Sequence, residues 1–123
     1  MIQPQSILNV VDNSGASKFK CIRILKGSKA RYGHTGDIIV GSIRKLRLKR
    51  KVNLGEVHYG LITKTVKPDF KKDGSLTVFK TNSVVLLNKK KRIYATRILD
   101  VVSIKLRQKK FMRILLMTGY NYV

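Results

Sequence analysis

The sequence predicts a mainly β protein, folded as a sandwich or a barrel. Short apolar segments rich in β-branched residues recur along the chain, and turn signals containing Gly, Asn and Asp separate them. Closing such a sheet into a barrel would also remove exposed strand edges. The length of 123 residues is typical of one domain, so we expect residues 1–123 to form a single fold.

The expected strands follow one another along most of the chain. Seven segments qualify by their β-branched and aliphatic content: residues 7–11, 19–25, 38–43, 57–66, 76–79, 84–87 and 98–104. Residues 12–15 and 33–36 separate strands and are expected to be turns. The second of these resembles the GxxG loop that clamps RNA in KH domains. That loop should join two helices, whereas here an apolar run follows it.

Two segments carry both apolar and basic side chains. In residues 43–51 the two kinds interleave, which predicts an extended ribbon with one basic face. Near the C-terminus, Phe111, Ile114 and Leu115 follow the i, i+3, i+4 spacing of an amphipathic helix. We therefore expect a basic ribbon in the first half of the chain and a short C-terminal helix.

The charge balance predicts a polyanionic partner. The chain has 27 Lys and Arg residues against 6 Asp and Glu residues, a formal net charge of +21. Repulsion of this size disfavours the compact state until an anion such as nucleic acid neutralises it. A single basic run is usually only a solvated face, but four runs, at 44–51, 64–72, 89–92 and 105–113, together favour contact with phosphates.

Candidate catalytic and metal-binding groups are sparse. Asp12, Asp37 and Asp73 lie beside or near Gly, where a carboxylate usually caps a turn. His34 and His58 lack partners at a metal-ligand spacing, and the single cysteine is expected to be a buried apolar residue. An acyl or phosphoryl transfer enzyme would need a convergent cluster of acid, base and nucleophile in a pocket. We expect neither an enzyme nor a cofactor.

A free single-strand binder of the OB or cold-shock type is the other alternative. Such a protein should display a clustered aromatic platform on which bases stack. The six aromatic residues considered, Phe19, Tyr32, Tyr59, Tyr94, Tyr120 and Tyr122, form no such motif. Most are expected to be core residues, with Tyr32 the best candidate for an exposed stacking surface.

From end to end, the chain resembles the universal large-subunit ribosomal protein fourteen family. The segments that carry the resemblance occur in family order and include Met1-Ile2-Gln3, Leu8-Asn9-Val10, Asp12-Asn13-Ser14-Gly15-Ala16, Arg31-Tyr32, Gly36-Asp37-Ile38-Ile39, Gly60-Leu61-Ile62, Asp73-Gly74, Thr96-Arg97-Ile98 and Lys110-Phe111-Met112.

The chain also departs from the family pattern at several positions. Thr63 stands where the family has an aliphatic residue, and the motif around Thr96-Arg97 is interrupted at Ala95, Leu99, Asp100 and Val101. Lys105 stands where the family usually carries an acid, and the usual C-terminal ending is missing.

The resemblance implies a small five-stranded closed β-barrel with a projecting β-ribbon and short C-terminal helices. It also implies a structural role in the large ribosomal subunit, binding to large-subunit rRNA, and intersubunit bridges to small-subunit rRNA. The implied protein partners are the large-subunit proteins three and nineteen and a ribosome silencing factor. Neither a membrane nor a homo-oligomer is expected.

Two sets of site residues follow from the charge pattern and the resemblance together. Residues expected to bind rRNA are Arg31, Tyr32, Arg44, Arg47, Lys49, Arg50, Lys51, Lys64, Lys71 and Lys72. Residues expected at the subunit interface are Thr96, Arg97, Lys110 and Arg113.

Composition also bears on the compartment. Lys and Ile are abundant while Ala occurs only three times, a bias expected of an AT-rich coding sequence such as that of an organelle genome. Together with the family start at Met1 and the altered motifs, this favours an organelle-encoded protein of the mitochondrial matrix over one of the bacterial cytoplasm or plastid stroma.

Overall fold

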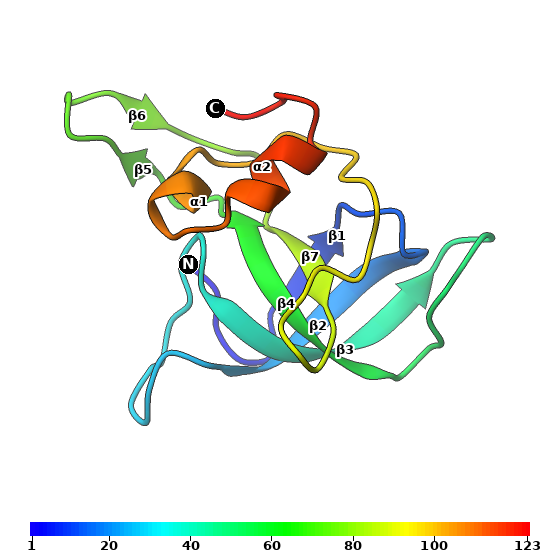
Figure 1. Ribbon diagram of the computed structural model, residues 1–123. Coiled ribbons are helices and arrows are strands. Elements are labelled where there is room, and N and C mark those ends of the chain that lie inside the picture. Colours follow the sequence, from blue (N-terminus) through cyan, green and yellow to red (C-terminus); the bar gives the residue numbers. More distant parts are fainter.

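Five strands form a closed β-barrel in the computed structural model, which describes residues 1–123 (Figure 1). They are β1 (Ile7–Val10), β2 (Ala16–Ile24), β3 (Ile38–Leu46), β4 (Val57–Lys64) and β7 (Ser83–Leu87). Neighbouring strands are antiparallel except β1 and β7, whose parallel pairing closes the barrel. The predicted fold class is thereby confirmed.

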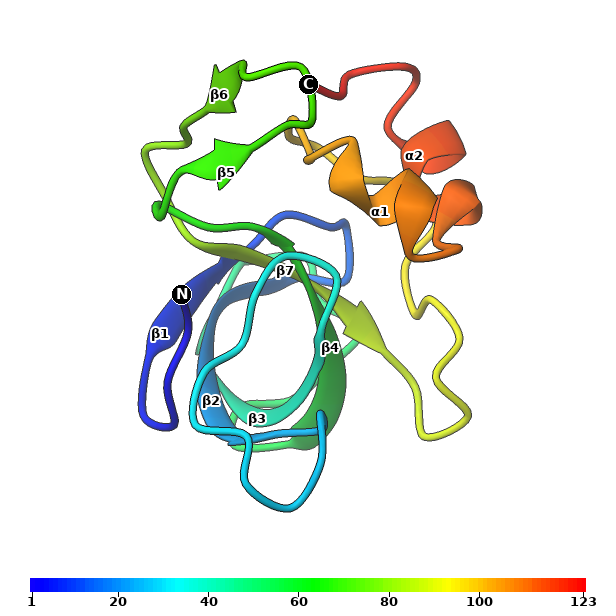
Figure 2. The ribbon, with the colours of Figure 1, turned by 90° about the vertical axis from the view of Figure 1, so that its left-hand side faces the viewer.

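Phe19 fills the centre of the barrel, whose ring of strands is seen in Figure 2. Two glycines make room for its ring. A Cβ added at Gly41 would lie 2.6 Å from Cε1 of Phe19, and one added at Gly60 would lie 3.1 Å from the same atom. The aliphatic side chains of all five strands complete this core, which includes Leu8 and Ile62.

A second apolar core lies between the outer face of the barrel and the C-terminal segment. It joins Leu61 of β4 and Val85 and Leu87 of β7 to Leu106 and Ile114 of the helices. Every residue of β7 is consequently buried. Burial on both faces explains why this strand has a continuous apolar run instead of alternation.

Two short helices, α1 (Lys105–Gln108) and α2 (Met112–Met117), cover this side of the barrel (Figure 1). The expected C-terminal helix is confirmed in α2, where Ile114 and Leu115 are buried and Phe111 precedes the first turn. Neither helix has the length and apolar character needed to span a membrane.

The projecting ribbon is not the one expected from residues 43–51. It is formed by β5 (Asp69–Phe70) and β6 (Leu76–Thr77), which extend beyond the barrel in both views. Strand β3 ends at Leu46, and Leu48 is fully exposed, so residues 47–51 have no apolar buried face. Backbone hydrogen bonds from Arg47 and Lys51 to the turn before β2 hold this segment as a loop.

The strand expected at residues 98–104 is also absent. This segment makes only isolated bridges, from Ile98 to Asp12 and from Val102 to Tyr122. Ile98 and Val102 are apolar because they pack in the second core, not because they belong to a sheet. The segments expected at 57–66 and 76–79 form strands too, but these end earlier, at Lys64 and Thr77.

Candidate nucleic-acid interface

Carboxylates near glycine cap turns, as predicted. Asp12 is buried, and its Oδ1 accepts a hydrogen bond from the Ser14 amide at 3.0 Å. Its other oxygen accepts the Leu86 amide at 2.8 Å, which ties the turn to β7. Asp73 accepts the Ser75 amide at 2.9 Å in the same way. Both acids hold the backbone of a turn, Asp12 in the interior and Asp73 at the exposed surface.

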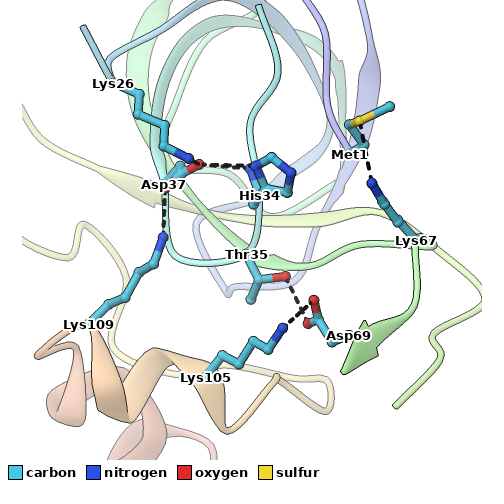
Figure 3. A network of polar contacts seen from close by, with 9 residues as sticks. All are labelled: Met1, Lys26, His34, Thr35, Asp37, Lys67, Asp69, Lys105 and Lys109. Atoms are coloured by element: carbon cyan, nitrogen blue, oxygen red, sulfur yellow. Dashed lines mark hydrogen bonds and ion pairs between the residues drawn. The ribbon is translucent and has the colours of Figure 1, made fainter. Parts of the chain in front are cut away.

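Asp37, just before β3 of the barrel, and Asp69, in β5 of the ribbon, both bind lysines of the helical segment (Figure 3). Asp37 accepts Lys109 Nζ at 2.7 Å and pairs with Lys26 at 3.4 Å, while Asp69 accepts Lys105 Nζ at 2.8 Å. Burial by itself would raise the pKa of Asp37. The hydrogen bonds from Lys109 and the His34 amide, with the charges of Lys109 and Lys26, outweigh burial and hold this pKa below its usual value.

The remaining acids, Asp100 and Glu56, are engaged as well. Asp100 accepts a hydrogen bond from Lys64, whose side chain is 9% exposed, and Glu56 pairs with His58 at 2.8 Å. Each of the six acids therefore makes a hydrogen bond or an ion pair with another residue of the chain. Only four Lys or Arg residues lie within ion-pairing distance of a carboxylate: Lys26, Lys64, Lys105 and Lys109. Nearly all the positive charge remains uncompensated at the surface.

The loop of residues 47–51 carries one dense group of such cations, and residues 89–92 carry another. Arg47, Lys49, Arg50 and Lys51 are all exposed, and Arg44 is exposed on the preceding strand. The loop is nevertheless fixed at both ends to the turn of residues 12–15. The Arg47 amide donates to the Gly15 carbonyl at 2.7 Å, and the Lys51 amide donates to the Ser14 carbonyl at 2.9 Å.

Gly15 permits this close approach between the turn and the loop. Its φ of +94° is a conformation that L side chains rarely adopt, and an added Cβ would lie 2.4 Å from Cα of Arg50. Any side chain at this position would push the basic loop away from the barrel.

Asn13 holds the predicted interface residues on the other side of the same turn. Its Oδ1 accepts the backbone amides of Thr96 at 3.0 Å and Arg97 at 3.2 Å, and its Nδ2 donates to Thr96 Oγ1 at 2.8 Å. Its own amide donates to the Arg97 carbonyl at 3.3 Å. The structure thus brings the basic loop and the Thr96-Arg97 segment to one end of the barrel. Sequence reasoning placed Asn13 in a turn but did not identify this role.

Arg31 and Tyr32 lie in a basic loop at another place on the molecule. Tyr32 is 43% exposed, and with Arg31, Lys26 and Lys29 it lines a hollow of about 520 Å³. An exposed aromatic ring among cations is a suitable surface for RNA.

The other predicted basic residues are distributed unevenly. Lys71 and Lys72 lie at the turn of the ribbon β5–β6, where Lys72 is exposed and Lys71 is partly buried. Lys64 differs from what the prediction assumed. It is buried, pairs with Asp100 and lies 5.8 Å from the centre of the Phe79 ring, so its charge is used within the chain.

Lys110 and Arg113 line a separate hollow of about 400 Å³ with Lys91 and Arg92. No hydrogen bond joins them to Thr96 or Arg97. The four residues predicted for the subunit interface therefore form two groups: Thr96 and Arg97 are held by Asn13, whereas Lys110 and Arg113 line the separate hollow.

Residues 1–120 match the model of the family described as Ribosomal protein L14p/L23e. The chain belongs to this family. It is accordingly a structural ribosomal protein of the large subunit, located in the ribosome. The resemblance seen in the sequence is confirmed for nearly the whole length of the chain.

Two of the expected departures from the family pattern, Lys105 and Asp100, form ion pairs. Lys105 contacts Asp69 and so links α1 to β5, while Asp100 contacts Lys64 at the end of β4. A third departure, Thr63, is fully buried and its hydroxyl has no hydrogen-bond partner among the protein groups. Lys105 thus anchors α1 to the ribbon and Asp100 anchors its segment to the barrel, whereas the Thr63 hydroxyl has no such partner.

Proposed function

We propose that this L14p/L23e protein binds large-subunit rRNA through its uncompensated basic surface and contributes to bridges with small-subunit rRNA. The observation that carries the proposal is the loop of residues 47–51, which has four exposed cations and whose two ends are held by backbone hydrogen bonds to the turn of residues 12–15. A fixed basic loop can follow a phosphate backbone without a large loss of conformational freedom on binding.

Further rRNA contacts are proposed at Arg31 and Tyr32, at Arg44, and at Lys71 and Lys72. These residues are at least partly exposed and have no carboxylate partner. Lys64 is proposed only as a support for the segment around Asp100, because its ammonium group is already paired.

For the subunit interface we propose Thr96 and Arg97, with Lys110 and Arg113 as additional contacts. Support comes from the exposure of all four side chains and from the clamp by Asn13, which presents Thr96 and Arg97 in a fixed conformation. Family membership supports ribosomal proteins as partners, and we propose that these are the large-subunit proteins three and nineteen, with a silencing factor on the same face. The Lys- and Ile-rich composition supports a mitochondrial ribosome.

Sedimentation of gently lysed source cells tests this function. The protein should migrate with the large subunit on a sucrose gradient at low salt and stay there through moderate salt, as followed by mass spectrometry. Migration at the top of the gradient in both conditions would contradict the proposal and favour a free nucleic-acid binder.

A further inference from the structure

A band of aliphatic side chains crosses the outer face of the barrel, with one member on each of four strands. Ile7 of β1 is 59% exposed, Ile22 of β2 is 47% exposed and Val57 of β4 is 60% exposed, and Val40 of β3 is partly exposed. Side chains alternate along a strand, and the inward positions are taken by core residues such as Phe19. These four residues, the aliphatic band, therefore point away from the barrel.

Strand register makes the members of the aliphatic band neighbours. Ile7 pairs with Lys20, so Ile22, two residues further along β2, is its diagonal neighbour on the same face. Val40 pairs with the residue that follows Ile22. Val57 pairs with the second residue after Val40, which makes these two valines diagonal neighbours as well. The band is consequently continuous from β1 to β4.

The helices and the ribbon leave this face uncovered. The second core, where the helices pack, involves β4 and β7. In Figure 2 the helices and the ribbon lie above the ring of strands, whereas β2 and β3 form its lower side. Single exposed apolar residues are common on protein surfaces, but a contiguous apolar patch with a charged rim is typical of a protein interface.

The rim of the aliphatic band is positively charged. Lys20 is partly exposed and Arg23 is exposed, and neither has a carboxylate within ion-pairing distance. Glu56 precedes Val57, but its carboxylate is paired with His58 at 2.8 Å. Charge complementarity therefore requires a partner with an apolar face and carboxylates beside it.

Three other occupants fit this face less well. A second copy of the chain would bring the same cations and another net charge of +21 against it. RNA would place charged phosphates on aliphatic side chains, and none of the four members of the band is aromatic and able to stack on a base. An added strand needs a free sheet edge, which the closed barrel lacks. The partner must pack through its side chains.

We propose that the aliphatic band is the docking surface for an acidic amphipathic segment of a neighbouring large-subunit protein. Its apolar side chains cover Ile22 and Val57, and its carboxylates lie beside Lys20 and Arg23. The inference rests on the proposed function only in that the partner belongs to the large subunit. It uses none of the residues proposed to bind RNA.

Photo-crosslinking from Val57→Cys in large subunits tests the class of partner. The natural Cys21 is buried, and burial raises the pKa of its thiol to about 11, so the new thiol is modified selectively. We expect mass spectrometry to find crosslinks to a protein segment with Asp or Glu beside apolar residues. Leu116→Cys is the control, because Leu116 is 58% exposed on α2, outside the band, and should not crosslink to that segment.

Binding of a synthetic peptide with the crosslinked sequence to the purified full chain tests the apolar contact. Fluorescence anisotropy should show that Ile22→Ser weakens binding about tenfold, the order expected when one aliphatic side chain is no longer buried. Leu116→Ser should leave the affinity unchanged. An unchanged affinity of the Ile22→Ser variant would overturn the docking surface.

The same peptide tests the charged rim. We expect the double variant Lys20→Glu, Arg23→Glu to weaken binding about tenfold at low salt and by a smaller factor at high salt. Lys89→Glu, Lys90→Glu is the matched control, with the same change of charge on another exposed segment. Equal losses in the two double variants would overturn the assignment, since net charge alone would then determine binding.

The outcomes in large subunits separate this inference from the proposed function. If the chain sediments with the large subunit but Val57→Cys crosslinks to rRNA, to a segment without acids or to nothing, the docking surface is overturned and the rRNA-binding function stands. If the chain does not enter the large subunit, the proposed function fails, and the inference fails with it.

Discussion

The hydroxyl of Thr63 is a local defect in the packing of β4. The side chain is fully buried, and no protein group lies within hydrogen-bonding distance of its oxygen. We predict that Thr63→Val, which keeps the side-chain shape, raises the free energy of unfolding by about 1 kcal/mol because it removes an unpaired buried polar group. Urea denaturation of the two proteins measures the difference. A less stable variant would show that this hydroxyl has a partner such as a bound water molecule.

The carboxylate of Asp37 makes folding depend on pH. Its pKa is lower in the folded chain than its ordinary value of about 3.8, so its contribution to stability is present above that value and is lost as the pH falls through the folded pKa. We predict that Asp37→Asn lowers the free energy of unfolding by about 1 to 3 kcal/mol at neutral pH, since Lys109 and Lys26 lose a charged partner.

The pH dependence of this difference provides the check. Denaturation of both proteins at neutral pH and at a pH well below 3.8 should show that the stability gap narrows in acid, as the pH falls through the lowered pKa of Asp37. A gap of the same size at both pH values would mean that the aspartate acts through its shape and not through its charge.

At the scale of elements, the turn of residues 12–15 joins the basic loop of residues 47–51 to the Thr96-Arg97 segment. We predict that Asn13→Ala frees the Thr96-Arg97 segment and raises amide hydrogen exchange at these two residues about tenfold or more, because their amides lose the Oδ1 acceptor. Exchange in β7 should remain unchanged, since Asp12 still binds the Leu86 amide. Exchange that rises equally in both places would indicate general destabilisation instead of a local clamp.

At the scale of the whole molecule, excess positive charge should control RNA affinity. We predict that replacing Lys49, Arg50 and Lys51 together by Gln weakens RNA binding and reduces the slope of log affinity against log salt by about 2 to 3. The loop residues are exposed, so folding should be retained. Titrations at several salt concentrations measure this slope.

The basic run beside α2 provides a control with equal charge. Replacing Lys89, Lys90 and Lys91 by Gln removes the same three charges from another exposed segment. We expect a smaller loss of affinity, because those side chains lie outside the fixed loop. Equal losses in the two triple variants would show that net charge alone, and not the position of the loop, determines binding.

Local patterns in the sequence were sufficient for the fold class and for several elements. Six of the seven β-branched runs, the turns at residues 12–15 and 33–36 and the helix that contains Ile114 and Leu115 were predicted correctly, whereas residues 98–104 form no strand. These features depend on side-chain periodicity and on the preferences of neighbouring residues, which a sequence displays directly. The charge excess is equally visible without coordinates.

Only the tertiary structure decided which distant residues meet. The β1–β7 pairing closes the barrel, Lys64 is buried against Asp100, and Asn13 binds Thr96 across a separation of 83 residues. The same kind of contact bends residues 47–51 into a loop and places Leu48 and Leu99 on one hollow. The sequence by itself determined what kind of elements and charges this protein has. Their arrangement into a site depends on contacts between segments whose separation along the chain leaves no periodic signal.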